Sequence, residues 1–387
     1  MVAGPFCGRL LADFGAEVLK VEPVEGDPVR SMGKQFEGKS LYAASIFRNK
    51  QLLAIDLRQP EGRELTRKIA TQSDIVVENF RPGGLEKWGL GYEELARIHP
   101  GIIMIRISGY GQTGPYSERP GFGATTEAFS GLRHLTGDPD RPPARVAVSL
   151  TDCLSGLYGA FGAMLALLHR NRTGQGQCVD TALYECAFSF MEPHVPAFDK
   201  LGLVANRAGS RLPDTTPNNL YPTGDDRYVH ITAPNDGLFR RLVGIMGQPQ
   251  LASDPRFATA RARAVHADEI DEMIAQWTSA RDTAQLEACL NEAEVPHSRI
   301  TTMADIFSDP HFQSRQMLAR ASSDDLGTVT LAGIVPKLSH TPGLIRHAGR
   351  CIGQDTRQVL RELVALSAAD IQRLEAQKVI YCGDNSE

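Results

Sequence analysis

The sequence predicts a protein of the α/β class, and three observations lead to this prediction. Several short apolar segments typical of strands are separated by longer segments with helical periodicity. This alternation is typical of a parallel sheet that helices cover on both faces. The chain has 387 residues, enough for two or three domains with sizeable cores.

Strands and helices follow one another through the first half of the chain. Strand-like segments lie at residues 17–21, 53–57, 74–78 and 102–107. Helical segments lie at residues 9–14, 60–72, 84–98, 151–170 and 179–193. Pro100 and Gly101 follow the helix at 84–98, and Pro193 ends the last one. The helix at 151–170 closes with His169 and Arg170, cations that suit a helix C-terminus.

The second half predicts a smaller α/β unit. Residues 206–222 are rich in Arg, Pro, Thr and Asn with little periodicity, which is typical of a crossover between domains or of a loop at a site. Strands are predicted at residues 220–221, 227–231 and 328–331, and helices at 236–246, 267–281, 283–291, 355–364 and 368–377.

Charge and hydropathy limit the classes of function. The chain has 41 basic and 46 acidic residues, and its net charge of −5 gives no global positive field for nucleic acid or an anionic membrane. The longest apolar run, residues 157–168, has 12 residues including two glycines, short of the roughly 20 that cross a bilayer. It predicts a buried helix. No secretory signal pattern opens the sequence, so we expect a cytoplasmic or organelle-matrix protein.

The cysteines and common catalytic motifs give little support for other chemistries. The seven cysteines are scattered, and they form no CxxC pair or Cys/His cluster at metal-ligand spacing. We expect reduced thiols and no metal site. No GxSxG or HExxH motif occurs, so serine hydrolase and zincin chemistry have no support.

Residues 109–114 match the GxGxxG pattern directly after a predicted strand. That pattern binds a dinucleotide only when a helix begins at the last glycine. Pro115 follows at once, and residues 116–123 have the composition of a loop. We therefore favour a substrate loop with close backbone approach over a dinucleotide site.

Asp152 lies between an apolar segment and the long predicted helix at 151–170. One interpretation is a capping aspartate at the helix N-terminus. The other is a catalytic carboxylate at a strand-to-helix junction, where backbone amides stabilise a developing oxyanion. The small residues Ser155, Gly156 and Gly159 would let a bulky ligand approach.

Basic residues lie in or beside the loops of the N-terminal half, as expected for contacts to a phosphate-bearing ligand. They are Arg30, Arg48, Lys50, Arg81 and Lys87. Solvated surface charge is the alternative interpretation of these side chains.

Longer motifs occur in one order along the chain. They are GPF at 4–6, LADFGAEV at 11–18, KVE at 20–22, GD at 26–27 with Arg30, NK at 49–50, DL at 56–57, VENFRPG at 77–83, SGYG at 108–111 with GP at 114–115, TD at 151–152, GQGQCVD at 174–180 and GQ at 353–354. Together they resemble the family III CoA-transferases, which include formyl-CoA, carnitine and succinyl-CoA-dependent enzymes and also α-methylacyl-CoA racemases. The resemblance covers nearly the whole chain.

The resemblance implies a fold and an assembly. It implies a Rossmann-like large domain built from residues 1–205 and 321–387, and a smaller α/β domain at residues 206–320. The linkers near Ala205 and Arg320 would be the crossovers between the domains. It further implies a homodimer whose two subunits thread through each other as interlocked rings.

The resemblance also implies the site residues. Asp152 matches the family's catalytic aspartate, and a coenzyme A thioester is the substrate rather than a bound prosthetic group. The matching CoA-binding positions are Arg30, Ile55, Asn79, Phe80, Lys87 and Trp88. Ser108 and Tyr110 belong to the same binding region, and Tyr110 matches a tyrosine that lines the acyl site.

The reaction implied by the resemblance moves CoA from an acyl-CoA donor to a carboxylic acid acceptor. Asp152 would form an aspartyl anhydride and then an aspartyl-CoA thioester. Water must be excluded from a carboxylate nucleophile, a task we assign to residues 109–123 and 233–237. Arg207, Arg211, Asn218 and Asn219 are candidate contacts to the acceptor, with ordinary loop solvation as the alternative interpretation, and a dicarboxylic acceptor is one hypothesis.

Three departures from the family pattern are visible. The His-Asp pair of the racemases is replaced by Gly121, Phe122 and Gly123, and Phe122 cannot shuttle a proton. The glycine-rich loop of formyl-CoA transferases corresponds to residues 233–237, which read APNDG. The family's first strand has no counterpart ahead of the GPF motif, so we expect unpaired backbone groups in the sheet, a start downstream of the natural one, or another segment in its place.

Three alternatives to a CoA-transferase follow from the same residues. An acyl-CoA racemase or isomerase is disfavoured by Phe122. An inactive CoA-binding protein is compatible with the absent strand and disfavoured by Asp152. A nicotinamide-dependent dehydrogenase depends only on the pattern at residues 109–114.

Overall fold

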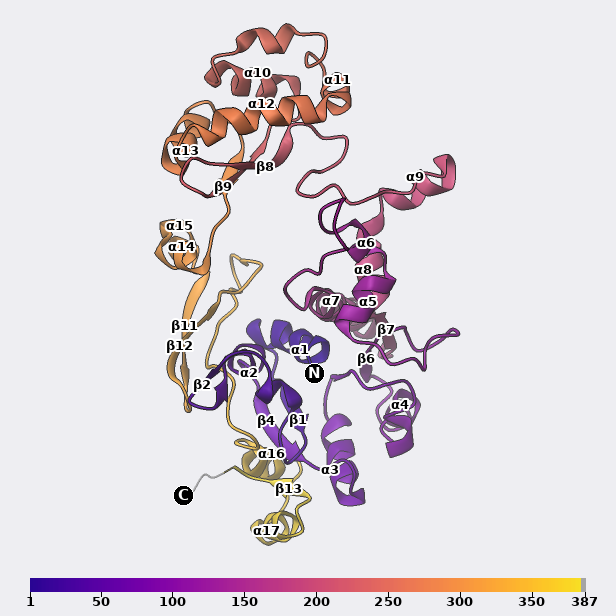
Figure 1. Cartoon of the computed structure of the whole chain (residues 1–387). Helices are drawn as coiled ribbons and strands as arrows, with labels where there is room; N and C mark the ends of the chain where they lie inside the picture. The colour runs from indigo at the N-terminus through magenta and orange to yellow at the C-terminus, as the bar shows by residue number, and fades with distance from the viewer. Residues whose placement is uncertain (384–387) are drawn as a thin grey trace. The chain divides into compact units, whose positions relative to one another are not determined.

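The structure is a computed structural model that describes residues 1–383, and it divides into two compact units (Figure 1). The large unit contains Met1–Leu132, Val146–Leu203 and the chain from His311 onward. The small unit contains Arg133–Arg145 and Val204–Pro310. The sequence placed the two main transitions at 205/206 and 320/321, and it did not separate residues 133–145 from the large domain.

The large unit contains two three-stranded sheets. In the first, β5 (Ile75–Glu78), β6 (Ile103–Ser108) and β7 (Cys178–Ala182) are all parallel, with β6 in the middle. In the second, β1 (Leu19–Glu22) runs parallel to β4 (Gln51–Ile55), and β13 (Ile380–Tyr381) adds an antiparallel strand. Every residue of β6 is buried, as expected for a strand covered on both faces.

β1 and β5 each have a second edge without a strand in the part of the chain that the structure describes. β1 pairs with β4 alone, and β5 pairs with β6 alone. Helix α1 (Ala3–Asp13) packs on β5, and its Gly8 lies against Val18, the residue that precedes β1.

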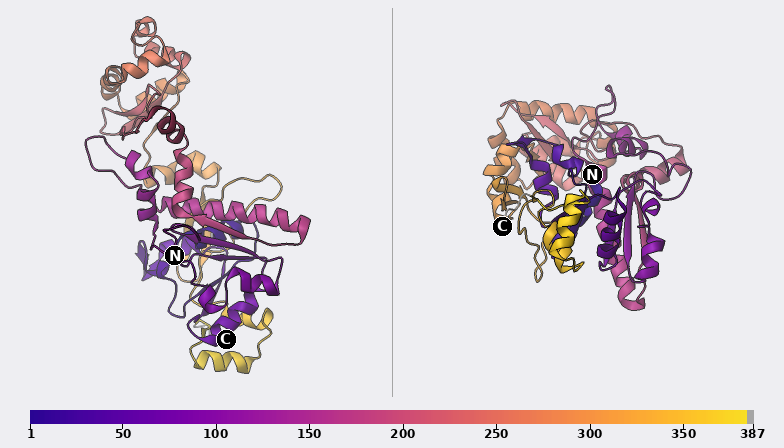
Figure 2. Two further views of the ribbon diagram at one scale, coloured as in Figure 1. Left: turned by 90° about the vertical axis from the view of Figure 1, so that its right-hand side faces the viewer. Right: turned by 90° about the horizontal axis from the view of Figure 1, so that it is seen from below.

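Helix α1 packs closely along α7 (Leu150–Thr173), and glycines make the approach possible. A Cβ on Gly156 would lie 2.8 Å from the carbonyl oxygen of Ala3, and one on Gly159 would lie 3.1 Å from the side chain of Ile105 in β6. Figure 2 shows α7 lying along the sheet within the large unit. Gly174, with φ of 74°, ends the helix in the left-handed conformation.

Only one face of α7 is buried in the single chain. The buried residues are mostly small, and large apolar side chains such as Leu157, Phe161 and Leu168 are more than half exposed. By length and composition alone, this is the one helix among the described residues that could span a membrane. Its packing on α1 and β6 places it in the core of the large unit.

Two predicted helices are partly wrong. The segment 84–98 contains a 3-10 turn at Glu86–Trp88 and then α4 (Tyr92–Ile98), because Gly89 adopts a left-handed conformation between them. The segment 179–193 begins as strand β7, which pairs with β6, and only α8 (Leu183–Phe188) and a 3-10 turn at Ser189–Met191 are helical. The other predicted helices and strands are present, with ends that differ by at most three residues, except that the helix predicted at 9–14 begins at Ala3.

The remaining elements of the large unit surround these sheets. The helices are α2 (Leu41–Ile46), α3 (Pro60–Ala70), α5 (Gly123–Phe129), α9 (His194–Leu201), α16 (Thr356–Glu362) and α17 (Ala368–Ala376), with a 3-10 turn at Pro28–Ser31. Two hairpins are formed by β2 (Gln35–Phe36) with β3 (Lys39–Ser40) and by β11 (Leu318–Ser323) with β12 (Gly327–Ala332). The short helices α6 (Leu132–Leu135) and α15 (Pro310–Ser314) lie where the chain passes between units.

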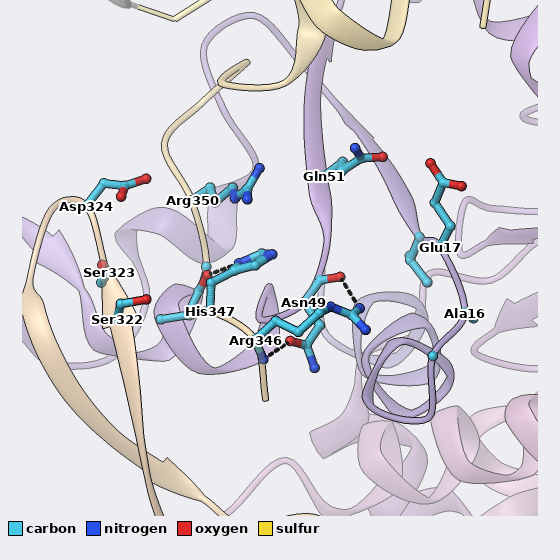
Figure 3. A pocket seen from close by; sticks show the side chains of 14 residues that line it. Ala16, Glu17, Asn49, Gln51, Ser322, Ser323, Asp324, Arg346, His347 and Arg350 are labelled. Carbon is cyan, nitrogen blue, oxygen red and sulfur yellow. Dashed lines mark hydrogen bonds between the residues drawn. The ribbon is translucent and has the colours of Figure 1, made fainter. Parts of the chain in front are cut away.

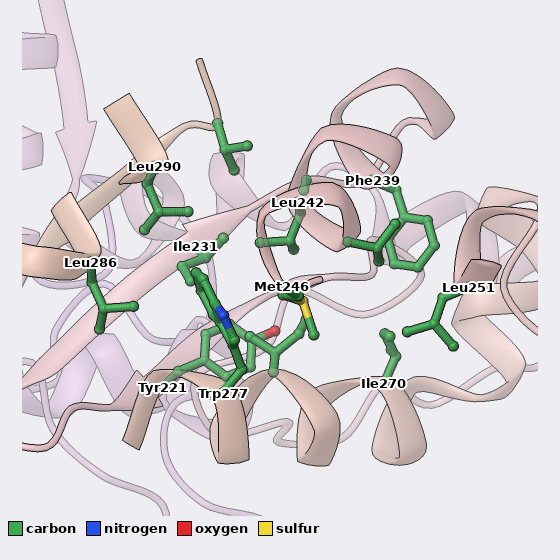
Figure 4. Close-up of a cluster of buried hydrophobic side chains, with 14 of the residues drawn as sticks. Tyr221, Ile231, Phe239, Leu242, Met246, Leu251, Ile270, Trp277, Leu286 and Leu290 are labelled. Carbon is green, nitrogen blue, oxygen red and sulfur yellow. The ribbon is translucent and has the colours of Figure 1, made fainter. Parts of the chain in front are cut away.

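The small unit has its own hydrophobic core. Its antiparallel sheet has the order β10 (His297–Arg299), β9 (Tyr228–Thr232), β8 (Asn218–Pro222). Its helices are α10 (Asp236–Ile245), α11 (Ala260–Val265), α12 (Ala267–Ser279), α13 (Thr283–Glu292) and α14 (Met303–Ser308), with a 3-10 turn at Pro249–Ser253. Figure 4 shows the core, where Trp277 and Ile270 of α12 pack with Leu242 of α10 and Ile231 of β9.

Candidate active site

Asp152 lies in the first turn of α7 rather than at its N-cap. The helix begins at Leu150 after Ser149, so the capping interpretation is wrong in detail, although a carboxylate in the first turn still complements the helix dipole. Gly123, the first residue of α5, lies directly against the Asp152 carboxylate. Thr151 donates its hydroxyl to the Gly123 carbonyl at 2.8 Å. The backbone of α5 therefore fixes one side of Asp152.

Tyr42 and Cys153 lie on another side of the same helix end. The Tyr42 hydroxyl forms a hydrogen bond with the Ser149 side chain, and burial raises the Tyr42 pKa. Burial and the Asp152 charge raise the pKa of the Cys153 thiol. Cys153 is thus held as a neutral thiol beside the carboxylate, which disfavours it as the nucleophile.

The loop after β6 contacts the segment that leads into α5 through two glycines. Gly109 and Gly121 touch so closely that a Cβ on either would lie 2.8 Å from the other's Cα. The Ser108 hydroxyl accepts a hydrogen bond from the Gly111 amide at 3.0 Å, and Gly111 has φ of 88°. No helix begins at Gly114, and the loop predicted at residues 116–123 is present up to the start of α5 at Gly123.

Tyr110 belongs to an aromatic cluster that the sequence did not reveal. Its ring lies 5.3 Å from Phe129 in an edge-to-face arrangement, and Phe129 contacts Tyr184 at 5.2 Å in the same way. Tyr116 joins Tyr110 and Phe129. The Tyr110 ring also lies 3.3 Å from the Cβ position of Gly121. Residues 121–123 therefore connect Tyr110 with Asp152.

The loop after β5 carries four of the predicted CoA-binding residues: Asn79, Phe80, Lys87 and Trp88. Phe80 and Trp88 pack edge to face at 5.5 Å, and Phe80 is 44% exposed. The Asn79 side chain lies against Gly4 at the start of α1. A half-exposed aromatic pair beside a lysine could stack on a base and contact phosphate.

Arg106 holds this loop in place from the neighbouring strand. Its Nε donates to Glu78 at 2.8 Å and its Nη1 lies 2.7 Å from Glu86. Glu78 also accepts a hydrogen bond from the Phe80 amide at 2.7 Å. Burial raises the pKa of Glu78 despite the hydrogen bond from Arg106. Sequence reasoning missed this pair, which the register of β5 and β6 places opposite each other.

Arg30 and Ile55 lie at the carboxyl ends of β1 and β4. Only Arg30 has side-chain groups that a ligand can contact. Arg30 donates to both oxygens of Glu22, at 2.6 and 2.9 Å, and to the Arg350 carbonyl at 3.1 Å. Two of its five N–H groups remain for a ligand. The Ile55 side chain is 1% exposed and belongs to a hydrophobic cluster, so a ligand can contact only its backbone.

The structure thus brings the predicted residues to the carboxyl ends of the parallel strands, where ligands bind in open α/β sheets. Arg30 and Ile55 follow β1 and end β4, the Asn79 loop follows β5, and Ser108 and Tyr110 follow β6. Asp152 joins Tyr110 through residues 121–123. The candidate acceptor contacts do not form a free cationic site: Arg207 donates to backbone carbonyls, and Arg211 is paired with Asp268 and Asp271, all within the small unit.

A polar cavity of about 680 Å³ lies elsewhere, at the amino ends of β1 and β4 (Figure 3). Its lining includes Glu17, Gln51, Asp324, Arg346 and Arg350. None of the predicted site residues lines it. In residues 1–383, no group of three or more His, Cys, Asp or Glu side chains is arranged to hold a metal ion, and all seven cysteines are free thiols.

The family model described as CoA-transferase family III matches residues 1–356. The chain belongs to this family. It is 47% identical over 381 residues to the succinyl-CoA--D-citramalate CoA-transferase of Chloroflexus aurantiacus, covering 98% of this chain and 95% of that protein. It is 34% identical over 372 residues to the succinate--glutarate CoA-transferase of Agrobacterium fabrum, covering 94% of this chain and 92% of that protein.

A solved structure of the same family has the same fold. The CAIB/BAIF family protein from Brucella suis is 34% identical and matches with a TM-score of 0.83, covering 94% of this chain and 96% of that one. These relatives establish the chain as an enzyme that transfers CoA between an acyl-CoA and an acid. The racemase, inactive-protein and dehydrogenase alternatives are not supported by them.

Proposed function

We propose that Asp152 is the nucleophile of this CoA-transferase and that the enzyme takes CoA from succinyl-CoA and passes it to a second dicarboxylic acid. The observation that carries the proposal is the position of Asp152. Its carboxylate lies in the first turn of a long helix, fixed against Gly123, and residues 121–123 connect it to Tyr110. A fixed carboxylate has less orientational freedom to lose when it attacks.

The proposed reaction uses only this carboxylate and the substrates. An Asp152 oxygen attacks the donor thioester carbonyl and expels CoA thiolate, which leaves a mixed anhydride. The thiolate attacks the aspartyl carbonyl, so the donor acid leaves as a carboxylate and an aspartyl-CoA thioester remains. The acceptor carboxylate then attacks this thioester, breaks its C–S bond, expels CoA thiolate and forms a second anhydride. Thiolate attack on its acceptor carbonyl releases the new acyl-CoA and restores Asp152.

The amides of the first turn of α7 support the steps in which negative charge develops on a carbonyl oxygen. The 24-residue helix presents its positive dipole end beside Asp152. No proton transfer or metal is required for these four steps. Phe122 occupies the place where racemases of the family carry a proton-transferring pair, and its side chain is 61% exposed beside Gly123. Racemisation therefore has no base at this position.

Coenzyme A binding is assigned to the carboxyl ends of β1, β4, β5 and β6. The exposed Phe80 and Trp88 pair would contact the adenine, Lys87 and the remaining N–H groups of Arg30 would contact phosphates, and Asn79 would donate a hydrogen bond. Ser108 would act indirectly by holding the Gly111 amide, and Ile55 through its backbone. The thioester end would then lie near Tyr110 and Asp152.

The choice of succinyl-CoA rests on the names of the relatives. Succinyl-CoA or succinate appears in the names of the Chloroflexus and Agrobacterium enzymes, whose second acids, citramalate and glutarate, are also dicarboxylic. A transfer assay with succinyl-CoA and citramalate, malate or glutarate tests this directly. Transfer to one of these acids supports the proposal, and transfer confined to monocarboxylic acids contradicts it.

We further propose a cytoplasmic homodimer, with the exposed face of α7 and helix α9 at the interface between two copies. Large apolar side chains gather on these helices: Leu157, Phe161, Leu165, Leu168, Phe198 and Leu201 are each at least half exposed. So much exposed apolar surface is unusual for a monomer. The interlocked arrangement would place the two crossovers near residues 203 and 311. Light scattering of Phe161→Glu tests the interface, because a charge there should yield monomers.

A further inference from the structure

Arg9 is a cation in helix α1 that the proposed reaction does not use. No hydrogen bond or ion pair of its side chain is present among the described residues, and its Nε is buried without a partner. An arginine at the surface ordinarily keeps Nε solvated or paired, because a buried donor without a partner costs free energy. A guanidinium without a protein partner can bind an anionic ligand.

The carboxylate whose charge acts on Arg9 is already paired with other side chains. Asp13, one turn further along α1, accepts from Arg48 Nε at 3.0 Å and Nη2 at 2.6 Å, and from the Asn49 amide at 2.9 Å. Arg48 is itself 1% exposed. Arg9, Arg48 and Asp13 together therefore leave one positive charge uncompensated. Burial, followed by the nearby Arg48, lowers the Arg9 pKa from its ordinary value, and Asp13 partly opposes this.

Arg9 lies on the side of α1 that faces the start of α7. Its guanidinium carbon is 4.2 Å from the centre of the Phe6 ring. Phe6 in turn contacts Gly156 so closely that a Cβ there would lie 2.9 Å from the ring. Gly156 follows Asp152 by four residues, so the two share one face of α7. Arg9 also interacts electrostatically with Cys153 and Tyr42. The cation is thus separated from the nucleophile by one ring and one helical turn.

We propose that Arg9 is a specificity-determining residue that binds the distal carboxylate of a dicarboxylic acyl group while the other carboxyl carbon reacts at Asp152. The inference rests on the proposed function, because it requires the acyl group to react at Asp152. Carboxylates are bound most firmly by the fork of two parallel N–H groups of a guanidinium, and the two Nη groups of Arg9, which are not buried as Nε is, supply them. The stack on Phe6 holds the plane of the fork. An acyl group with a terminal methyl would leave the partly buried Arg9 guanidinium without an anion and would bind less well.

The test compares succinyl-CoA with butyryl-CoA, which has the same chain length and a methyl group in place of the distal carboxylate. In the wild type, kcat/KM should favour succinyl-CoA. Arg9→Met should lower kcat/KM for succinyl-CoA roughly 10- to 100-fold and change it less than about threefold for butyryl-CoA. The loss should appear in KM rather than kcat, because the distal contact is equal in ground and transition states. Arg9→Lys, which keeps the charge and loses the fork, should fall between.

Equal losses for both donors would show that Arg9 has a structural role only, and an unchanged preference would also overturn the inference. Calorimetric binding of the two thioesters to Asp152→Asn and to Asp152→Asn/Arg9→Met separates this inference from the proposed function, since neither protein can form the anhydride. Loss of the succinyl-CoA preference only in the double variant supports the inference whether or not Asp152 is the nucleophile. Retention of the preference overturns it.

Discussion

Gly123 is in van der Waals contact with the carboxylate of Asp152, and no side chain larger than hydrogen fits at this position. A Cβ on Gly123 would overlap Asp152 Oδ2 and would lie 2.9 Å from Thr151 Oγ1. Gly123 is the first residue of α5, and Thr151 and Asp152 lie in the first turn of α7. The two helix starts therefore lock the orientation of the carboxylate together.

Gly123→Ala should lower kcat of CoA transfer by about two orders of magnitude while the protein stays folded, because a small displacement of a nucleophile is costly. Gly244→Ala in α10 is the matched control, since a Cβ there meets nothing within 4 Å. Steady-state kinetics and thermal unfolding check both variants. Full activity of Gly123→Ala would show that the position of Asp152 is not critical.

Glu78 should make the protein less stable as pH rises. Burial holds its pKa in the folded state above the ordinary value of 4.5, so the folded state binds the proton more tightly than the unfolded state. The loss of unfolding free energy caused by the ionised Glu78 is absent below pH 4.5 and complete above the raised pKa. Urea unfolding at several pH values should show a smaller decline for Glu78→Gln than for the wild type, with Glu61→Gln at an exposed helix position as control. If the free energy of unfolding declined equally with pH in the wild type and in Glu78→Gln, the assigned role of Glu78 would be contradicted.

Lys87 should contribute to CoA affinity through phosphate. It has an exposed side chain in the same turn as Trp88. Lys87→Met should weaken CoA binding about tenfold and reduce its dependence on salt, since one charge-assisted contact is lost. Titration calorimetry at two salt concentrations measures both effects. Lys68→Met, an exposed lysine of α3, should bind as the wild type does, and equal binding by both variants would remove Lys87 from the site.

Asp271 should be the most sensitive charged residue of the small unit. It is 7% exposed and accepts from the Tyr221 hydroxyl at 2.5 Å, Arg211 Nε at 2.6 Å and the Asn219 amide at 2.8 Å. Asp271→Ala should destabilise the protein by about 3–5 kcal/mol, because the buried Tyr221 hydroxyl, the Asn219 amide and Arg211 Nε all lose their acceptor. Asp268→Ala removes the exposed partner of the same Arg211 and should cost less than about 1 kcal/mol. Similar melting temperatures for the two variants would refute this account.

The sequence was informative where local pattern decides the structure. The apolar segments of β5 and β6 and the small residues of α7 predicted strands and a helix that are present. β7 was missed because the five residues Cys178–Ala182 run directly into α8, and only their pairing with β6 distinguishes them from the helix.

The surroundings of the site could not be predicted from local pattern. The pair of Glu78 and Arg106 depends on the register of two strands. Among the described residues, Arg9 has no ion-pair partner because the Asp13 carboxylate is bound to Arg48, which lies 35 positions from Asp13 in the sequence. The motif around Asp152 identified the candidate nucleophile, but its contact with Gly123 required two separate helix starts to meet.

The central claim is that Asp152 carries the acyl group and then CoA. Intact mass spectrometry of the wild type and of Asp152→Ala after incubation with succinyl-CoA, with hydroxylamine or borohydride trapping and peptide mapping, tests it most directly. An adduct is expected on Asp152 in the wild type and none in Asp152→Ala, which should also lose transfer activity. Transfer activity in Asp152→Ala, or an adduct mapped to another residue such as Cys153, would contradict it.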